Sequence, residues 1–331
     1  MKTKDFDYDL PPELIAQTPL EKRDGSRLLT LDKTTGAIGH HHFYDLPQFL
    51  RPGDCLVLNN SRVLPARLIG HRDTGGTAEV LLLTDRGDNL WECLVRPGKK
   101  LRAGARVHFG DGQLEAEIQE VLPDGNRLVK FFYEGIFLEV LEQLGRMPLP
   151  PYITSYEGDP EKYQTVYAMH EEHSAAAPTA GLHFTPELIE GLKAKGIGWA
   201  TVELEVGIDT FRLVEEDDPT QHVMHTERYH VAQDVVDAVH ATKAAGHRVV
   251  AVGTTAVRSL ESAFDADAPA AEPPMVARGF AGREDSADTL GRGDIVVREN
   301  ATTQLYLMPG STYHVVDALI TNFHVPRSTL M

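Results

Sequence analysis

The sequence predicts an α/β protein in which a layered α/β main domain carries an inserted small β-barrel domain. Three observations favour this class. Helix and strand patterns alternate in the second half of the 331-residue chain, and a length of this order suits two domains. Short β-rich runs separated by turn signals fill residues 62–145. We therefore expect residues 1–61 and 146–331 to form the main domain around residues 62–145.

The first 61 residues contain few regular elements. Residues 12–17 predict a short helix, with Pro12 near its start. Residues 27–31 and 38–43 predict a hairpin around a Thr-Thr-Gly turn. Residues 55–58 predict a buried strand that follows a Pro-Gly-Asp turn.

The inserted segment has the pattern of a small barrel or sandwich. Turn pairs such as Gly75-Gly76 and Asp124-Gly125 recur, and apolar residues alternate with polar ones over residues 114–119. Residues 136–144 then predict a helix that ends at Gly145.

The second half predicts alternating helices and strands. Thr185 is suited to cap a helix whose apolar residues share one face. A strand is expected over residues 199–206, a helix over 234–245, a buried strand over 248–252 and a helix over 254–264. Residues 265–274 and 279–293 have loop composition.

Composition excludes several classes of protein. Hydrophobic residues make up 42% of the chain and charged residues 24%, as in globular proteins with a real core. No apolar run approaches the roughly 18 residues of a membrane span, and the charged N-terminus lacks a secretory signal. The two cysteines, Cys55 and Cys93, provide neither a disulfide framework nor a zinc motif. We expect a cytoplasmic protein without a membrane partner.

The formal net charge of −17 argues against nucleic acid as a partner. Residues 61–72 and 96–110, however, carry arginines and lysines with no acidic residue among them. A basic face on an acidic protein can bind RNA, whereas the alternative is a set of solvated strand and turn residues.

Two segments have the pattern of a ligand site. In residues 253–258 (GTTAVR), Gly253 follows a strand and the next helix would offer free N–H groups, the Thr254 and Thr255 hydroxyls and Arg258 to an anion. An ordinary capped helix, with Thr254 as N-cap and Arg258 paired to Glu261 in solvent, is equally consistent. In residues 177–184 (APTAGLHF), small residues precede His183, which suits either a proton shuttle or a structural histidine.

Three further segments carry polar groups. Asn59, Asn60 and Arg62 (in LNNSR) are suited to bind a nucleotide or to close a turn, and Asn322 and His324 (in ITNFHVPRSTL) to form a site rim or a turn. The segment QHVMHTE contains His222, His225 and Glu227, and His230 follows it, but this spacing matches no zinc motif. We expect no metal site.

Together, eight stretches resemble one family, the S-adenosylmethionine:tRNA ribosyltransferase-isomerases of queuosine biosynthesis (the QueA family). They follow the order of the family and cover nearly the whole chain: LVLNNSRVLPARL, RPGKKL, MPLPPYI, YQTVYA, APTAGLHFT, VMHTE, VAVGTTAVRSLES and ITNFHVPRSTLM. The resemblance implies an α/β domain with a smaller β-barrel domain, which agrees with the fold class expected from the residues.

The resemblance also implies a reaction and its partners. The family transfers and isomerises the ribosyl group of S-adenosylmethionine onto 7-aminomethyl-7-deazaguanine at the wobble position of tRNAs with a GUN anticodon. The product is epoxyqueuosine, and adenine and methionine leave. Beyond S-adenosylmethionine as co-substrate no cofactor is expected, and we expect a monomer.

The matched motifs imply the following roles in this chain. His183 is the leading acid/base candidate, with His225, Glu227 and His324 as second choices. The expected substrate-binding residues are Asn59, Asn60, Arg62, Tyr163, Thr179, Gly181, Gly253, Thr254, Thr255, Arg258 and Asn322.

The chain departs from the family pattern in two places. Residues 205–211 read EVGIDTF where the family commonly has HVGAGTF, and the family usually continues beyond the STLM segment. The alternatives to the family reaction are another RNA-modifying enzyme that uses S-adenosylmethionine, such as a methyltransferase, and a non-catalytic RNA-binding protein.

Overall fold

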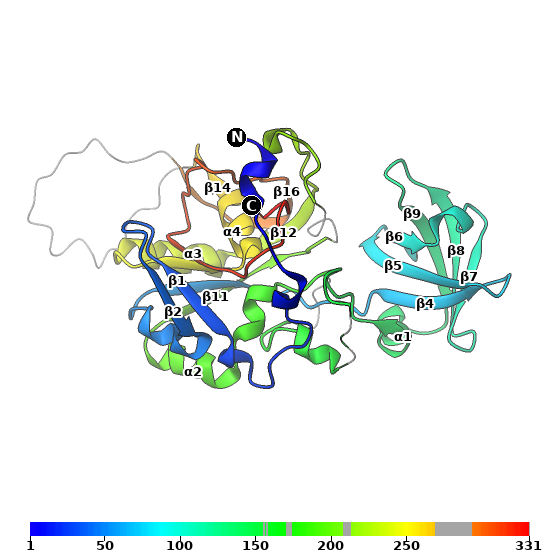
Figure 1. Ribbon diagram of the computed structural model, residues 1–331, viewed down its shortest axis with the longest axis horizontal. Helices are drawn as coiled ribbons and strands as arrows, with labels where there is room; N and C mark the ends of the chain where they lie inside the picture. Colours follow the sequence, from blue (N-terminus) through cyan, green and yellow to red (C-terminus); the bar gives the residue numbers. More distant parts are fainter. Residues whose placement is uncertain (155, 157, 170–173, 208–212, 269–292, 331) are drawn as a thin grey trace, which may run out of the picture.

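The computed structural model describes residues 1–331 except residues 155, 157, 170–173, 208–212, 269–292 and 331. It is a mixed α/β protein, and the predicted fold class is confirmed. A layered α/β body carries a separate β-barrel at one side (Figure 1). The predicted domain boundaries near residues 61 and 146 stay a prediction. None of the described helices has both the length and the apolar content needed to cross a bilayer.

A six-stranded sheet forms the centre of the α/β body. Its order is β16-β12-β11-β3-β13-β17, in which β11, β3, β13 and β17 are parallel and β12 and β16 extend one edge in antiparallel pairing. The strands are β3 (Cys55–Asn59), β11 (Gly198–Leu204), β12 (Glu227–Val231), β13 (Val249–Val252), β16 (Arg298–Thr303) and β17 (Ala318–Ile320).

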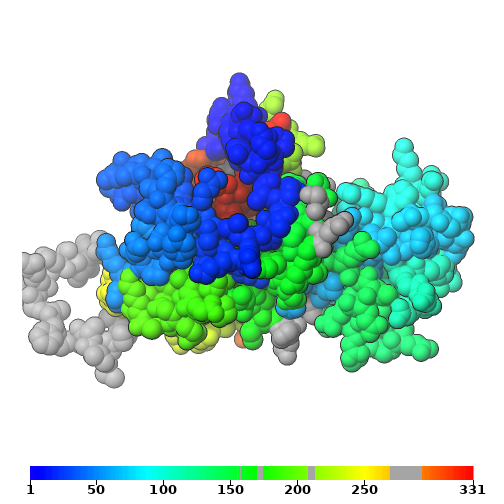
Figure 2. All heavy atoms as spheres, turned by 60° about the horizontal axis from the view of Figure 1, so that its bottom comes forward, coloured from blue at the N-terminus to red at the C-terminus, as the bar shows by residue number. Residues whose placement is uncertain are grey.

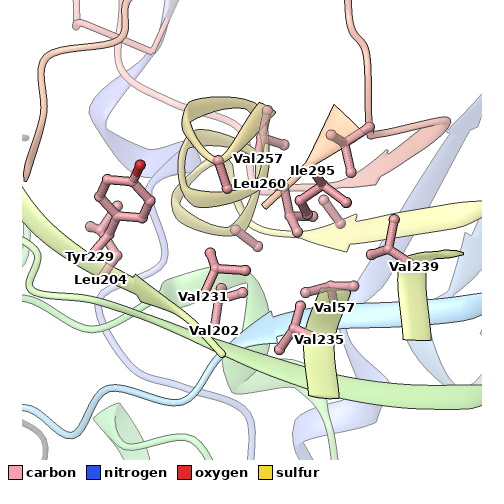
Figure 3. Close-up of a cluster of buried hydrophobic side chains, with 14 of the residues drawn as sticks. Val57, Val202, Leu204, Tyr229, Val231, Val235, Val239, Val257, Leu260 and Ile295 are labelled. Carbon is pink, nitrogen blue, oxygen red and sulfur yellow. The ribbon is translucent and has the colours of Figure 1, made fainter. Parts of the chain in front are cut away.

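Helices cover both faces of this sheet, so its central strands are apolar on both sides. Alternation along β3 sends Cys55 and Val57 toward α3 (Gln233–Ala244) and α4 (Thr254–Ser262). Leu56 and Leu58 point to the opposite face, toward α2 (Pro186–Ala194). Figure 3 shows the first of these two cores, with Val57, Val235, Val257 and Leu260 converging.

The barrel consists of six antiparallel strands. They are β4 (Arg67–Arg72), β5 (Thr77–Asp85), β6 (Leu90–Arg96), β7 (Arg106–Phe109), β8 (Leu114–Val121) and β9 (Arg127–Tyr133), and pairing between β4 and β7 closes the ring. A further strand, β10 (Gly145–Arg146), pairs with β4 after helix α1 (Phe137–Leu144). Leu68, Val80, Phe109 and Phe131 fill the interior, so the barrel has a core of its own.

The remaining elements are short. The predicted hairpin is confirmed as β1 (Arg27–Leu31) and β2 (Ile38–His42), and β14 (Phe264–Asp265) pairs with β15 (Asp294–Ile295). The described 3₁₀ turns are η1 (Thr3–Phe6), η2 (Pro12–Leu14), η3 (Arg23–Gly25), η4 (Phe43–Gln48), η5 (Gly98–Lys100), η6 (Pro160–Tyr163), η7 (Thr179–His183) and η9 (Pro219–Gln221).

Several elements differ from the sequence expectations. The helix expected at residues 12–17 is only the three-residue turn η2. The strand expected to reach residue 206 ends at Leu204, because Val206 leaves the sheet: its N–H donates to Ser174 Oγ, and its oxygen accepts from the Ala175 N–H. Strands β16 and β17 lie in segments that carried no strand prediction. Most of the expected loop over residues 265–293 lies outside the described residues.

Candidate functional site

Three distant stretches line one cavity at the carboxyl ends of β13 and β17. Residues 177–180 form one wall, residues 253–255 another, and residues 321–330 the floor. Crevices at the carboxyl ends of parallel strands are the usual ligand sites of such sheets. The cavity encloses about 70 Å³, so it accommodates only part of a nucleoside unless its walls part.

Segments from both ends of the chain frame this region. Figure 2 shows red C-terminal atoms bordered by blue atoms of the N-terminal 50 residues and, on one side, by green atoms. The hydroxyl of Tyr8 donates a hydrogen bond to the backbone oxygen of His324, which links the N-terminal segment to the floor. The N-terminal segment therefore helps to hold the floor of the cavity in place.

The turn between β13 and α4 exposes backbone donors to the cavity. Gly253 adopts φ +88° and ψ 150°, a conformation that side chains disfavour, and this lets α4 begin directly after the strand. No side chain caps this helix, so the N–H groups of Thr254 and Thr255 lack an intrahelical partner. The Thr255 hydroxyl is buried and has no partner among the described residues. These donors suit an anionic group.

The second wall contacts the first directly. Turn η7 begins after Pro178 and buries Ala180 beside Gly253, where an added Cβ would lie 3.7 Å from the Ala180 Cβ. The two loops singled out in the sequence, APTAGLHF and GTTAVR, therefore share one cavity. Thr179, Gly253, Thr254, Thr255 and Asn322 all line it.

His183 lies behind the cavity wall rather than in it, and both of its ring nitrogens are engaged. Its Nε2 lies 2.9 Å from Asn322 Oδ1, and its Nδ1 lies 3.1 Å from Ser26 Oγ. Burial lowers the pKa of His183, partly offset by the hydrogen bond with Asn322, so the neutral ring is favoured. A neutral ring held in this way has no free lone pair for a substrate proton.

His324 differs from His183 in its hydrogen bonding and in its place in the cavity. It lines the cavity, and no described residue hydrogen-bonds its ring. Burial lowers the pKa of His324, which keeps the imidazole neutral near pH 7 and its lone pair available. Among the four acid/base candidates from the sequence, His324 is therefore the one whose geometry suits proton transfer.

Asn59 and Asn60 serve the sheet. Asn59 is completely buried, its amide donates to the Leu204 oxygen at 3.1 Å, and its Oδ1 accepts from Ser61 and from the Leu204 N–H. Asn60 donates to Thr201 Oγ1 at 3.4 Å. Neither residue lines a described cavity; both link β3 to β11, and the expected nucleotide contact stays a prediction.

Arg258, Glu227 and His225 form a cluster beside α4. Arg258 Nη1 lies 2.5 Å from Glu227 Oε2, and His225 Nε2 lies 3.0 Å from Glu227 Oε1. Arg258 Nη2 donates to the His225 oxygen at 2.9 Å. None of the three lines the cavity; the Arg258 guanidinium neutralises a buried carboxylate, and its expected anion-binding role stays a prediction. Neither Arg258 in solvent nor a contact with Glu261 is observed; Glu261 accepts from the backbone of residues 314–316.

Gly181 and Tyr163 also lie outside the cavity lining. A Cβ at Gly181 would overlap the hydroxyl of Tyr167, so glycine is required here for packing rather than for ligand approach. Tyr163 is buried against Tyr156, with ring centroids 5.1 Å apart. Both residues thus occupy packing positions, and their expected substrate contacts stay predictions.

A second, larger cavity of about 680 Å³ lies between the barrel and the α/β body. Arg62, Arg67 and Arg146 line it, together with Glu142 and Glu161. Arg62 pairs with Glu161 at 2.9 Å, and Arg67 pairs with Glu79 at 2.9 Å. Arg146 has no carboxylate partner among the described residues. Residues 147–164 connect the two cavities, since Tyr152 lines the first and Tyr156 the second.

The basic segment of the barrel is held as a rigid turn. Arg127 is buried and donates to the backbone oxygens of Leu101 at 2.7 Å and Gly98 at 2.8 Å, which fixes turn η5. Lys99 and Lys100 on this turn have no acidic partner among the described residues, whereas Arg106 pairs with two glutamates. Lys99 and Lys100 therefore offer positive charge without an acidic partner among the described residues, and the basic face stays a prediction.

Several cavity residues were not among the site residues expected from the sequence. Tyr152, Val206, Thr321, Ser328 and Leu330 line the cavity; their segments match the family or form the altered EVGIDTF stretch, but their residue types alone did not mark them as ligand contacts. Val206 belongs to the altered EVGIDTF segment, whose residues 208–211 lie outside the described part of the chain. Among the described residues no group of three His, Cys, Asp or Glu side chains is placed to hold a metal ion.

Comparisons with known proteins agree with one another. The family model described as "Queuosine biosynthesis protein" matches residues 3–331. Proteins from Desulfitobacterium hafniense and Symbiobacterium thermophilum, both named S-adenosylmethionine:tRNA ribosyltransferase-isomerase, are each 49% identical over 332 residues, which is all of this chain and 89% of each relative. The crystal structure of an S-adenosylmethionine tRNA ribosyltransferase from Thermotoga maritima is 35% identical, with a TM-score of 0.45 over 98% of this chain and 86% of that one.

Proposed function

Because the chain belongs to the queuosine biosynthesis protein family, we propose that it acts as an S-adenosylmethionine:tRNA ribosyltransferase-isomerase. It transfers and isomerises the ribosyl group of S-adenosylmethionine onto 7-aminomethyl-7-deazaguanine at the wobble position of tRNA. The acceptor tRNAs are those with a GUN anticodon, the protein acts as a monomer, and the reaction belongs to the cytoplasm.

The chemistry uses the reactivity of the donor itself. The sulfonium acidifies the adjacent ribose carbon, so a base removes a proton there and adenine leaves. The aminomethyl nitrogen then attacks, and methionine departs when the epoxide closes. These steps draw on S-adenosylmethionine as co-substrate and call for no further cofactor. The protein must supply a base, an acid for the leaving adenine and a site for the methionine carboxylate.

One observation carries the assignment to this cavity. The loops APTAGLHF (residues 177–184) and GTTAVR (residues 253–258) are far apart in the sequence, yet both line the same space at the carboxyl edge of the sheet. We assign the methionine carboxylate to the N–H groups and hydroxyls of Thr254 and Thr255, because a helix N-terminus stabilises an anion by about 0.3–1 kcal/mol. We assign acid/base chemistry to His324, the cavity imidazole without a described partner.

For the tRNA we propose the groove between the barrel and the α/β body. Arg62 and Arg146 line this groove, and Lys99 and Lys100 add charge on the barrel. Phosphate binding by such side chains overcomes the acidic balance of the whole chain when the cations are locally concentrated.

A single incubation tests the proposal. The protein is mixed with S-adenosylmethionine and a GUN-anticodon tRNA that carries 7-aminomethyl-7-deazaguanine, and the products are separated. Equal amounts of free adenine and methionine, with epoxyqueuosine in the tRNA, are expected. S-adenosylhomocysteine would instead indicate a methyltransferase, and tRNA binding without turnover of the donor would indicate a non-catalytic RNA-binding protein.

A further inference from the structure

The Ser26–His183–Asn322 chain connects three distant parts of the sequence through one imidazole. Ser26 immediately precedes β1, His183 ends turn η7, and Asn322 follows β17. The two contacts, of 3.1 Å at Nδ1 and 2.9 Å at Nε2, are both within hydrogen-bond range. Of the three residues, only Asn322 lines the cavity.

The proton positions follow from the acceptor at one end. Asn322 presents its oxygen to His183, so Nε2–H donates to Oδ1. Because burial lowers the pKa of His183, the neutral ring is favoured and Nδ1 faces the Ser26 hydroxyl, which also lies 3.2 Å from the Arg23 backbone oxygen. Both nitrogens are then used inside the protein. The Asn322 amide nitrogen remains, and no described residue accepts its hydrogen bonds.

We propose that His183 and Ser26 are positioning residues that fix the Asn322 amide, so that its N–H groups bind an acceptor atom of the S-adenosylmethionine nucleoside. An asparagine amide without this constraint rotates freely and presents oxygen or nitrogen to the cavity. The His183 contact removes that freedom, which lowers the entropic cost of binding. This inference rests on the proposed function, and it replaces the acid/base role expected of His183 from the sequence.

A glutamine at position 183 separates positioning from proton transfer, because its amide donates a hydrogen bond but cannot act as an acid or base near pH 7. We expect His183→Gln to keep adenine release within about threefold of wild type. His183→Ala should weaken S-adenosylmethionine binding about tenfold, which corresponds to the loss of about 1.4 kcal/mol of hydrogen-bond stabilisation. His240→Gln is the matched control, because His240 Nε2 contacts Asp294 Oδ1 at 2.8 Å and neither residue lines a described cavity.

A double-mutant cycle provides the second test. If His183 acts only through Asn322, His183→Ala should not weaken donor binding further in an Asn322→Ala background. Binding is measured by calorimetry with S-adenosylmethionine alone, and adenine release in a single turnover with substrate tRNA. Thermal unfolding of each variant checks that it is folded.

Two results would overturn the inference. One is a His183→Gln protein that binds S-adenosylmethionine normally but no longer releases adenine. The other is an equal loss from His183→Ala with and without Asn322. Failure of the wild-type protein to bind the donor or release adenine would instead reject the proposed function, so the two failures are distinguishable.

Discussion

Arg258 Nη1 lies 2.5 Å from Glu227 Oε2, in a pair whose side chains are only 11% and 4% exposed. Breaking such a pair leaves one buried charge without compensation, which costs about 3–5 kcal/mol. Arg258→Ala should therefore lower the free energy of unfolding by that amount in urea denaturation. Arg106→Ala, which removes two exposed ion pairs, should cost less than about 1 kcal/mol. Equal losses of unfolding free energy in the two variants would show that the buried pair stabilises the protein no more than the exposed pairs do.

His324→Gln should lower the rate of adenine release by a factor of about 10² or more, with little change in donor affinity. Burial lowers the pKa of His324 below its ordinary value of 6.5, so the ring stays neutral as the pH falls to 6.5 and loses its basic form only at lower pH. The acidic limb of the wild-type rate profile is thus expected below pH 6.5. An acidic limb unchanged in His324→Gln would exclude this residue as the base.

Thr255→Val should affect the free and the bound protein in opposite directions. The buried hydroxyl has no described partner in the free protein, so its removal should stabilise the fold by about 1 kcal/mol. The same change should weaken S-adenosylmethionine binding about tenfold, because the hydrogen bond from the Thr255 hydroxyl to the ligand is lost. Thr255→Ser keeps the hydroxyl and serves as the control. Thermal unfolding and calorimetry measure the two effects, and unchanged affinity in Thr255→Val would remove Thr255 from the site.

Gly181→Ala should destabilise the protein by about 1–3 kcal/mol, because the added Cβ overlaps the Tyr167 hydroxyl. Removal of that hydroxyl in Tyr167→Phe should recover part of the loss in the double variant. Thr165 Cγ2 would still lie 3.0 Å from the new Cβ, so recovery should be incomplete. Urea denaturation of the four proteins checks this, and a double variant no more stable than Gly181→Ala would contradict the steric account.

Replacement of both Lys99 and Lys100 by glutamate should raise the KM for tRNA and leave the affinity for S-adenosylmethionine unchanged. If both lysines contact phosphates, the slope of log affinity against log salt should fall by about two. Lys193→Glu on α2, where Lys193 pairs with Glu190, is the control for a change of surface charge. An unchanged salt slope in the double glutamate variant would exclude turn η5 from the RNA surface.

Local patterns in the sequence predicted most elements of the fold. Thr185 caps α2 through a bond from the Leu188 N–H, as its place before Pro186 indicated. Gly253 marks the start of α4, because few other residues adopt its conformation. Strand β17 is only three residues long and has one mostly exposed position, so it offered too little periodicity for a prediction.

The site was less predictable, because burial and pairing depend on residues far apart in the chain. Nothing near Arg258 in the sequence identifies Glu227 as its partner, since β12 and α4 meet only in the folded protein. In the same way, the motif around His183 does not reveal that Ser26 occupies its second nitrogen. Residue types could identify which loops gather at the cavity, but not which side chains remain free there.

The chain is held by hydrogen bonds at Val63, just before the first strand of the barrel. Gln164 accepts from the Val63 N–H at 3.1 Å and donates to the Val63 oxygen at 2.7 Å, and Ser61 just before it is tied to Asn59. These hydrogen bonds therefore hold the junction in one conformation, and it does not act as a free hinge. Any reorientation of the barrel has to bend the chain beyond Val63. The distance between the barrel and the cavity at the carboxyl edge of the sheet is therefore set by the α/β body. Insertion of one residue at this junction should consequently be harder to tolerate than an insertion of the same size in a barrel turn.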